Sequence, residues 1–536
     1  MHPFPPLLGR RLRGPWVPAW ALAGLFAALY GCVAVNRHRR VLTQAYDLGI
    51  FEQAVRAYAH GEAPVVLLKG PGYHLLGDHF HPMLAALAPF YRLFPHAETL
   101  LVAQAVLMAL AVVPLTRWAY EAGGWRVAVA VGVVTGASWG IVNAAADDFH
   151  EIAFAVPLLA FAATALGRGR PVAAACWALP LVLVKEDLGL TVAAFGVLIL
   201  RRAPRAGGGR ALGFAVALFG VAATASTVLV VLPAFNPDGG FDYWHQLGAG
   251  GTSSAPWAAA VRLGWPPLKW LLLFLLAATA GFLGVRSPLA LLCVPTLAWR
   301  LLADNPHYWG VGYHYSAVLM PLLVAALVDT LGRAGLPGRK GAAGPVDGAD
   351  AGARGTGPGS GVPGVPGVRG VRGAVGVRGA RRALAVGLLV AAVTIPVYPL
   401  HEVVMPEAWR TPPRLAQTRE LLARIPDGAT VAASNRLAAQ LTGRATVALV
   451  CREPVPGPAP APPVPGPASA PPVPGPASAS GASASGGPQW VAVDLADPSV
   501  RAPCAIEDTR RMLDRYERDG YRTVVDGDGL LLLERP

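Results

Sequence analysis

The sequence predicts a polytopic all-α membrane protein, a helical bundle of about 11 spans with a small extracytoplasmic α/β domain in its C-terminal part. Of the 536 residues, 54% are apolar and only 14% are charged, whereas an ordinary soluble domain is about 25% charged. The apolar residues fall in repeated runs whose length approaches the ~20 residues that cross a bilayer. The net charge of +13 lies mostly in short clusters between those runs. That distribution is typical of membrane topology and argues against a nucleic-acid partner.

Eleven apolar runs are candidate transmembrane spans, and several are short for a helix perpendicular to the bilayer. The first run follows Arg10, Arg11 and Arg13 and has the charge pattern of a signal peptide. No small-residue cleavage site follows it, so we expect an uncleaved membrane anchor. The runs lie near residues 16–35, 98–119, 126–146, 152–167, 171–185, 187–200, 211–233, 268–285, 288–303, 313–332 and 383–400.

Basic residues between the runs predict the orientation, because cytoplasmic loops carry an excess of Lys and Arg. If the N-terminus is cytoplasmic, most basic clusters fall inside, and the loop 333–382 alone carries nine Lys or Arg against two Asp. The cluster from Arg37 to Arg40 is the exception. We therefore predict a multi-pass protein of the cell membrane with a cytoplasmic N-terminus and an extracytoplasmic C-terminal domain.

The same reading divides the chain into parts and low-complexity segments. Residues 337–380 are rich in Gly, Pro, Val and Arg, and residues 453–488 contain the sequence PPVPGPASA twice. Neither composition can bury a core, so we expect both stretches to be disordered or extended. The predicted parts are a bundle at 1–332 with an external loop at 36–97, a cytoplasmic loop at 333–382, a last span at 383–400, and an external domain at 401–536.

The C-terminal part reads as a small α/β domain with the Pro-rich stretch inserted as a loop. Residues 507–519 have the pattern of an amphipathic helix, and a turn at Asp526-Gly-Asp-Gly predicts a terminal hairpin. Cys451 and Cys504 can pair if the domain is external, but sequence supplies no geometry and leaves the pairing open. Strands are expected at 430–433, 446–450, 490–494, 521–526 and 530–533.

Ionisable residues near membrane depth are costly, so they are the candidate functional residues. Asp47 lies at the start of an amphipathic helix in the first external loop, and Glu52 follows in the same segment. Asp47 is either a helix N-cap or a base or ligand, and both roles are compatible. Asp78, His79 and His81 fall within four residues and are able to bind a metal or move a proton, or simply form a polar turn.

Two further clusters interrupt the apolar runs. Four ionisable side chains fill a tight turn between two spans, where they repel one another unless they share a cation; a solvated turn is the alternative. In the second cluster Lys185 pairs with a neighbouring acid, or binds an anionic phosphate. The first cluster is Asp147, Asp148, His150 and Glu151, and the second is Lys185, Glu186 and Asp187.

Aromatic and histidine residues at 304–315 form another candidate group, in which an interfacial belt explains Tyr308 and Trp309 better than His307 and His314. Residues 235–246 add Asp238, Asp242 and His245 with less weight. The chain has no Walker A motif, no GxGxxG before a helix, no GxSxG and no CxxC pair. ATP hydrolysis, dinucleotide redox chemistry and nucleophile-elbow hydrolysis therefore lack support.

Several of these motifs resemble a family of predicted bacterial membrane proteins known as domain of unknown function 2079. The resemblance covers most of residues 16–332 and the C-terminal domain, without the two low-complexity segments. The matching sequences are YDLGIFEQ at 46–53, GDHFHP at 77–82, FHE at 149–151, KED at 185–187, HYSAVLMP at 314–321, IPDGATVAASNRLAAQLTGR at 425–444 and WVAVDLADP at 490–498.

The family has no firmly assigned activity, but its architecture resembles the C-type (GT-C-like) membrane glycosyltransferases, which take sugar from a polyprenyl-phosphate donor. By that analogy the chain moves sugar to an envelope acceptor at the outer face of the membrane. The alternatives are a transporter or lipid flippase and a non-catalytic envelope-assembly protein. The roles implied are catalytic for Asp47, Glu52, Asp78, His79, His150 and Glu151, substrate-binding for Lys185, Glu186, Asp187 and His314, and Mg²⁺ or Mn²⁺ ligation for Asp147 and Asp148.

Overall fold

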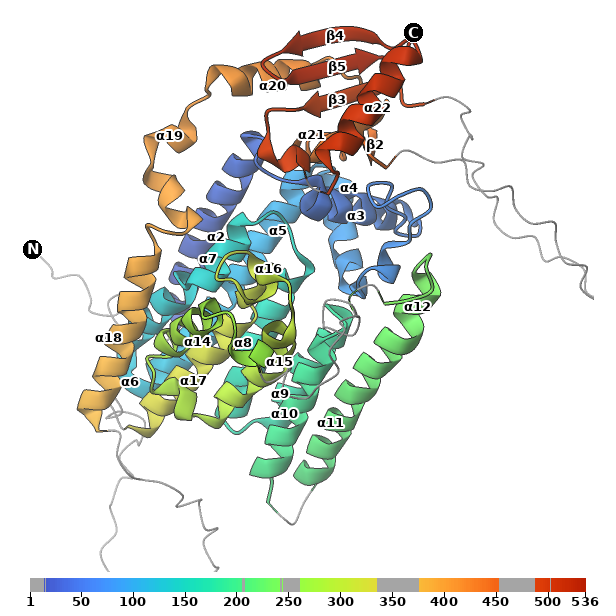
Figure 1. Ribbon diagram of the computed structural model, residues 1–536. Helices are drawn as coiled ribbons and strands as arrows, with labels where there is room; N and C mark the ends of the chain where they lie inside the picture. Colours follow the sequence, from blue (N-terminus) through green and yellow to red (C-terminus); the bar gives the residue numbers. More distant parts are fainter. Residues whose placement is uncertain are drawn as a thin grey trace, which may run out of the picture.

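The computed structural model describes residues 14, 16–204, 208–241, 243, 261–334, 376–452, 487–501 and 503–536. Most of the predicted loop 333–382, nearly all of the Pro-rich insertion 453–488, and Asp242 and His245 lie outside the described residues. Figure 1 shows a helical bundle with a small sheet domain packed on one end. This agrees with a helical membrane protein that carries an α/β domain.

Each of the eleven predicted apolar runs contains helix. Many of these helices are broken by short 3₁₀ or π-helical turns rather than continuous. The bundle helices are α2 (Trp16–Arg39), α5 (Ala97–Leu110), α6 (Val112–Gly136), α7 (Trp139–Ala146), α8 (Ala155–Gly167), α9 (Pro171–Ala178), α10 (Leu188–Arg202), α11 (Gly209–Ser226), α12 (Leu232–Phe235), α14 (Leu268–Thr279), α15 (Val294–Leu302), α16 (Pro306–Trp309), α17 (Leu319–Arg333) and α18 (Val377–Thr394).

Among the described residues, four helical segments are long and apolar enough to cross a membrane. They are Trp16–Arg39, Ala97–Gly136, Gly209–Phe235 and His314–Arg333. Shorter apolar helices lie at Glu151–Gly167, Pro171–Leu183, Leu268–Thr279 and Pro288–Leu302. Length and composition thus support an integral membrane protein, while the number of eleven spans stays a prediction.

The segment Ala97–Gly136 is two antiparallel arms rather than one rod. Gly124 has φ 75° and ψ −165°, a conformation essentially restricted to glycine, and it reverses the chain in the middle of α6. The two arms meet where Gly132 faces Thr116, since a Cβ added at Gly132 would lie 2.7 Å from the Thr116 hydroxyl oxygen. This reversal separates the predicted runs 98–119 and 126–146.

Two further breaks bring polar residues into the bundle. Between α7 and α8 the chain forms a short turn at residues 147–154. Between the 3₁₀ turn Leu179–Leu183 and α10, Lys185, Glu186 and Asp187 lie outside regular helix. The apolar stretch 171–200 is therefore not one helix, and its charges sit at a break in the chain.

The C-terminal domain has a five-stranded sheet in the order β2-β1-β3-β5-β4. Strand β1 pairs in parallel with β2 and β3, while β5 pairs antiparallel with β3 and β4. A disulfide joins Cys451 to Cys504 and closes the question that the sequence left open. The elements are α19 (Pro406–Trp409), α20 (Pro413–Ala423), β1 (Thr430–Ala433), α21 (Asn435–Ala439), β2 (Thr446–Leu449), β3 (Trp490–Asp494), α22 (Ile506–Arg518), β4 (Arg522–Gly527) and β5 (Leu530–Glu534).

The predicted external loop 36–97 forms a layer between the sheet domain and the bundle (Figure 1). It contains the π-helical turn η1 (Ala45–Gly49), α3 (Ile50–His60) and α4 (Ala88–Leu93). The buried face of α3 shares one apolar core with the buried faces of β1, β2 and β3. Burying this apolar surface fixes the domain on the layer.

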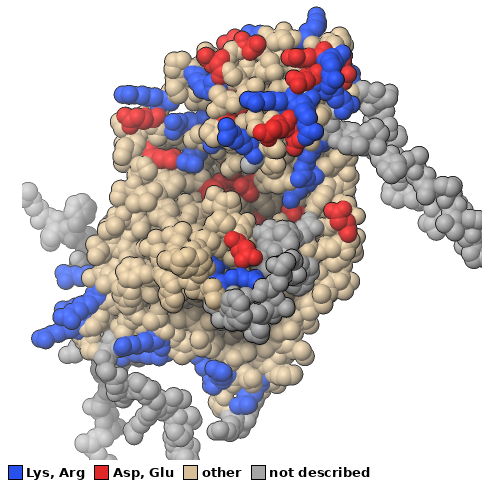
Figure 2. All heavy atoms as spheres, in the orientation of Figure 1, with Lys and Arg blue, Asp and Glu red and all other residues tan. Residues whose placement is uncertain are grey.

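Charged side chains are distributed unevenly over the surface. On the face drawn in Figure 2, acidic and basic residues mix over the sheet domain, and the visible part of the bundle below it carries few charged residues. At the opposite end, where α10 and α17 end and α18 begins, the charged residues in view are Lys and Arg. The scarcity of charge on the visible bundle and the basic end agree with a membrane protein.

Candidate functional site

A cavity of about 510 Å³ lies where the external layer, the two chain breaks and the helices α10 and α11 meet. Most of the candidate residues from the sequence converge on it, although they come from distant parts of the chain. The ionisable residues that line the cavity are Asp47, Lys69, Asp78, His79, His81, His150, Glu151, Lys185, Glu186, Asp187 and His314, together with the phenols of Tyr46, Tyr243, Tyr308 and Tyr315.

Asp47 enters the cavity from η1, and its side chain is 38% exposed. No side chain caps η1, and Asp47 lies inside the turn, so the N-cap role is not what the structure displays. Instead the Asn435 Oδ1 atom of α21 accepts hydrogen bonds from the backbone N–H groups of Ala45 and Tyr46, at 2.9 and 3.3 Å. The C-terminal domain thereby helps to fix the segment that carries Asp47.

Asp78 forms an ion pair with a lysine that sequence reasoning missed. The Lys69 Nζ atom lies 2.7 Å from Asp78 Oδ2, and the Tyr243 hydroxyl donates to Asp78 Oδ1 at 3.1 Å. Burial acts to raise the pKa of Asp78, but His79 and Lys69 together lower it to about 2. Asp78 is therefore an anion at neutral pH. The chain has only four Lys, which was the available signal for Lys69.

His79 bridges the external layer to the break before α10. Its Nδ1 atom lies 2.8 Å from Glu186 Oε1, and the Phe80 N–H donates to Glu186 Oε2 at 3.2 Å. Burial and Lys185 act to lower the pKa of His79, but Glu186 and Asp78 raise it above its ordinary value. The imidazole is therefore protonated more readily than an ordinary histidine side chain.

Lys185 and Asp187 have separate partners across the cavity. Lys185 Nζ lies 2.6 Å from Glu151 Oε1. The Trp299 indole N–H donates to Asp187 Oδ2 at 2.9 Å.

The turn after α7 is held from α5 by Gln104, whose side chain is completely buried. The Gln104 amide donates to the Asp148 carbonyl at 2.6 Å and accepts from the His150 N–H at 2.9 Å. Asp148 has φ 51° and directs its carboxylate to the Gln44 N–H at 3.2 Å. The predicted pair Asp147 and Asp148 is therefore divided between two environments.

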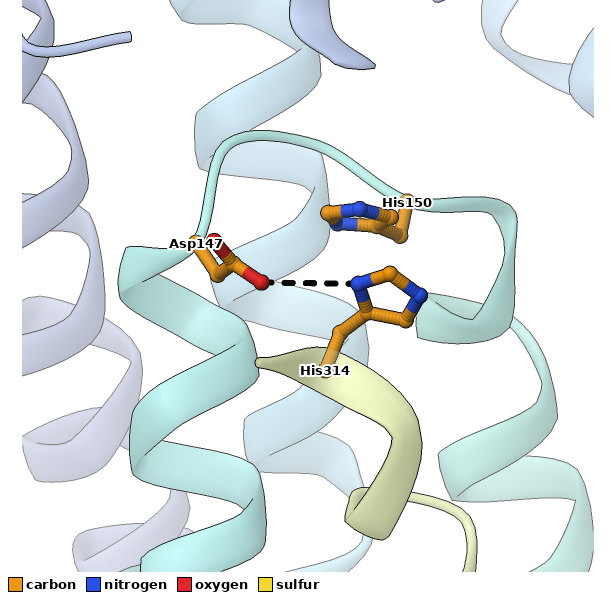
Figure 3. A group of neighbouring side chains, drawn as sticks. All are labelled: Asp147, His150 and His314. Carbon is orange, nitrogen blue, oxygen red and sulfur yellow. Dashed lines mark hydrogen bonds and ion pairs between the residues drawn. The ribbon is translucent and has the colours of Figure 1, made fainter. Parts of the chain in front are cut away.

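Asp147, His150 and His314 form a compact group at the edge of the cavity (Figure 3). One potential ligand atom from each lies within 4.8 Å of those of the other two. Asp147 Oδ2 is 3.4 Å from His314 Nδ1, and His150 Nε2 is 3.4 Å from Asp47 Oδ1. Burial lowers the pKa of His150, but Asp47 and Asp147 raise it to about 9.

Glu52, predicted as catalytic, is not among the described residues that line the cavity. It is 1% exposed, on the opposite side of α3, and accepts hydrogen bonds from the hydroxyls of Tyr91 and Thr442. Burial raises the pKa of Glu52 to about 7 despite these two donors. Its contacts are with α4 and the C-terminal domain, which makes it an interface residue.

One wall of the cavity is apolar and belongs to helices whose outer faces are exposed. Leu190 of α10 and Val228 and Leu229 of the segment after α11 line the cavity. In the possible span Gly209–Phe235, only 22% of the most apolar stretch is buried inside the protein, and Leu229 is 66% exposed. The cavity thus combines a charged wall with an apolar wall at the lipid-facing side of the bundle.

Comparison with known proteins yields one family. The profile described as Predicted membrane protein (DUF2079) matches residues 37–342, more than half of the chain. That range contains every residue named above as lining the cavity. No curated protein and no solved structure matches the chain.

Proposed function

Because the chain belongs to the DUF2079 family of predicted membrane proteins, a name that assigns no activity, we propose its function from the cavity. We propose a membrane glycosyltransferase of the C type, which moves a sugar from a polyprenyl-phosphate donor to an envelope acceptor at the outer face of the cytoplasmic membrane. The observation that carries the proposal is the cavity itself, which joins ionisable groups to an apolar wall on exposed helices. A lipid-borne phosphate sugar requires both surfaces.

Asp47 is the proposed general base. In the proposed step its carboxylate removes the proton of the acceptor hydroxyl, and the acceptor oxygen bonds to the anomeric carbon of the sugar. The bond between that carbon and the phosphate oxygen breaks, so polyprenyl phosphate leaves with the electron pair. The Asp47 side chain is 38% exposed, more than those of Asp78 and Glu151, which also line the cavity. Unlike those two carboxylates, Asp47 forms no ion pair with Lys or Arg among the described residues.

Lys185 and Lys69 are proposed to stabilise the phosphate. Each lysine faces the cavity and each is paired with one carboxylate. The donor phosphodiester carries one negative charge, and the polyprenyl monophosphate released when the sugar–phosphate bond breaks carries about −1.5 to −2, so two lysines beside it would stabilise the leaving group. His79 is the proposed proton donor in the cavity. Glu186, Asp187 and His314 complete the proposed substrate contacts. A divalent ion would act as a Lewis acid at the same place.

The external location of the site is also proposed. The disulfide between Cys451 and Cys504 supports it, because such bonds persist in oxidising compartments. The C-terminal domain that contains this disulfide contacts the segment of Asp47 directly. The cavity would therefore lie on the same side of the membrane as the domain.

The test is turnover of lipid-linked sugar by the purified full-length protein with native lipids. Radiolabelled polyprenyl-phosphate sugars are supplied with and without Mn²⁺, and loss of label from the donor is measured. Asp47→Ala should reduce turnover by about 10²–10⁴-fold, the usual contribution of a general base. Glu62→Ala, in an exposed acidic residue outside the cavity lining, is the matched control and should keep full turnover.

A transporter or lipid flippase is the second candidate, and the break at Lys185, Glu186 and Asp187 favours it. Transporters bind substrates at such interruptions of membrane helices. Translocation of a fluorescent polyprenyl-phosphate sugar across the membrane of vesicles that contain the protein, without loss of the sugar, would support this function and overturn the transferase. Turnover that requires Asp47 would overturn the transporter.

A further inference from the structure

We propose that Asp147, His150 and His314 bind a single divalent transition-metal ion of the zinc class at the edge of the cavity. The three residues come from the turn after α7 and from the loop before α17, and their side chains point toward one another (Figure 3). Asp147 and His314 are 167 residues apart in the sequence, so it is the fold that brings them together.

The distances fit one ion. Around a tetrahedral zinc with bonds of about 2.1 Å, two ligand atoms lie roughly 3.4 Å apart. Asp147 Oδ2 and His314 Nδ1 are 3.4 Å apart, and the three potential ligand atoms lie within 4.8 Å of one another. Rotation of the side chains is needed to close the set on a common centre.

His150 supplies an independent observation. It is 3% exposed, and its Nδ1 atom has no hydrogen-bond partner among the described residues, whereas Nε2 lies 3.4 Å from Asp47 Oδ1. Buried polar atoms without a partner are rare and call for an explanation such as a bound ion. The His150 and His314 rings lie against each other with centroids 3.5 Å apart and an interplanar angle of 32°, so binding one ion through both rings requires them to turn their nitrogen atoms toward a common point at the ring edges.

The surrounding structure fixes the ligands in place. Gln104 holds the backbone at His150 through the hydrogen bond at 2.9 Å. On the other side, the fully buried Arg300 donates to the Tyr315 carbonyl at 3.1 Å and to the Ser316 hydroxyl at 3.2 Å. Such outer contacts orient metal ligands and strengthen binding.

The donor atoms select the metal. Two imidazoles with one carboxylate suit zinc, manganese or iron, whereas magnesium and calcium prefer oxygen ligands. This set differs from the Mg²⁺ or Mn²⁺ pair expected at Asp147 and Asp148, because the Asp148 carboxylate accepts from the Gln44 N–H instead. His150 and His314 also line the cavity, so a coordination position faces the substrate space, beside Asp47.

The metal site deepens the proposed function, because an ion there would polarise a substrate oxygen next to Asp47, but binding of the ion does not depend on that function. The test accordingly uses no donor or acceptor. Full-length protein in detergent is stripped with chelator, dialysed and titrated with Co²⁺, whose visible absorption reports imidazole ligation. We expect one Co²⁺ per chain, displaced by Zn²⁺ and retained in excess Mg²⁺.

Variants locate the site. His150→Ala and His314→Ala should each weaken Co²⁺ binding by at least about 10-fold, whereas His96→Ala, in an exposed histidine, should bind like the parent protein. Asp147→Asn keeps the side-chain volume and should also weaken binding, which serves if a histidine variant does not elute as a single species. Absence of stoichiometric Co²⁺ binding by the parent protein, or unchanged binding by His150→Ala and Asp147→Asn, overturns the proposal. Neither result bears on sugar transfer, which is measured separately.

Discussion

The lysines that face the cavity each have an acidic partner, and so does the histidine that faces Glu186. Lys69 pairs with Asp78, Lys185 with Glu151 and His79 with Glu186, at 2.7, 2.6 and 2.8 Å. Removing one partner of a buried ion pair leaves an uncompensated charge and costs about 3–5 kcal/mol. The charged residues of the cavity therefore stabilise the fold in addition to contacting any ligand. Single substitutions among them need a separate measurement of folding.

Glu52 makes the stability of the protein depend on pH. Burial raises its pKa from an ordinary value of 4.5 to about 7 in the folded state. The folded state thus binds this proton more tightly than the unfolded state, so the stabilisation is present at low pH and is lost as pH rises toward 7. Since one pKa unit corresponds to about 1.4 kcal/mol, the loss is roughly 3 kcal/mol.

The measurement is the thermal unfolding midpoint of parent protein and Glu52→Gln between about pH 5 and about pH 8. The parent should lose stability relative to Glu52→Gln as pH rises, because glutamine cannot ionise. Glu62→Gln, in an exposed glutamate of the same layer, should follow the parent. A difference between parent and Glu52→Gln that does not change with pH would contradict the prediction.

Most cavity residues could be predicted from sequence, and the reasons for the misses are physical. Asp47, His150 and Lys185 stand out because they are ionisable within or beside apolar runs, where burial is costly. Lys69 and Tyr243 lie in polar loops, where charged and aromatic residues are common and carry little signal. Glu52 was placed with Asp47 by proximity in sequence, but its partner Thr442 lies 390 residues away and no local pattern indicates it.

At the level of helices, the chain reversal within α6 depends on Gly124. A side chain at φ 75° and ψ −165° costs about 1–3 kcal/mol. Gly124→Ala should therefore lower the thermal unfolding midpoint in detergent. Gly24→Ala is the matched control, since a Cβ at Gly24 meets nothing within 4 Å and the residue lies in regular helix. Equal midpoints for the two variants would show that the reversal is not strained by a side chain.

The turn after α7 depends on a single side chain of α5. Gln104→Leu removes the acceptor of the His150 N–H and the donor to two carbonyls, of Ala144 and Asp148. Buried groups left without partners cost about 1–3 kcal/mol, so the unfolding midpoint should fall. Gln417→Leu, in an exposed glutamine of α20, should leave the midpoint unchanged. A midpoint for Gln104→Leu equal to that of Gln417→Leu would contradict this role.

The elements themselves followed from local sequence patterns. Strands expected at 430–433 and 490–494 lie at Thr430–Ala433 and Trp490–Asp494, because alternating apolar residues and turn signals are local. The expected helix 507–519 lies at Ile506–Arg518. The breaks at residues 147–154 and 184–187 were marked by charge alone, and only the fold reveals that both open on the same cavity.

For the molecule as a whole, the orientation in the membrane is the most accessible prediction. In intact cells, a membrane-impermeant maleimide should label Asp427→Cys in the C-terminal domain and spare Gly376→Cys at the start of α18. Both positions should react after permeabilisation. The background is a variant without Cys32 and Cys176, which are the exposed free cysteines. Labelling of Gly376→Cys alone in intact cells would place the domain in the cytoplasm.

Hydropathy was sufficient for the fold class, but the packing of distant segments was not accessible. The contact between Ala45 and Asn435 joins residues that are 390 positions apart in the sequence, with most of the bundle helices between them along the chain. Such contacts depend on shape and on buried area rather than on periodicity. For the same reason the sequence gives eleven apolar runs, while length and composition of the folded helices single out four that are able to cross a membrane.

The hydrogen bonds from Ala45 and Tyr46 to Asn435 set an order in the biogenesis of this protein. While the ribosome is still translating the bundle, the turn that carries Asp47 has emerged but its amide acceptor has not been synthesised. The bundle is therefore inserted into the membrane before the turn at Ala45 and Tyr46 has its hydrogen-bond acceptor. The turn gains that acceptor only after the C-terminal domain has been synthesised and has folded, so fragments released early from the ribosome would lack the contact that fixes the segment of Asp47.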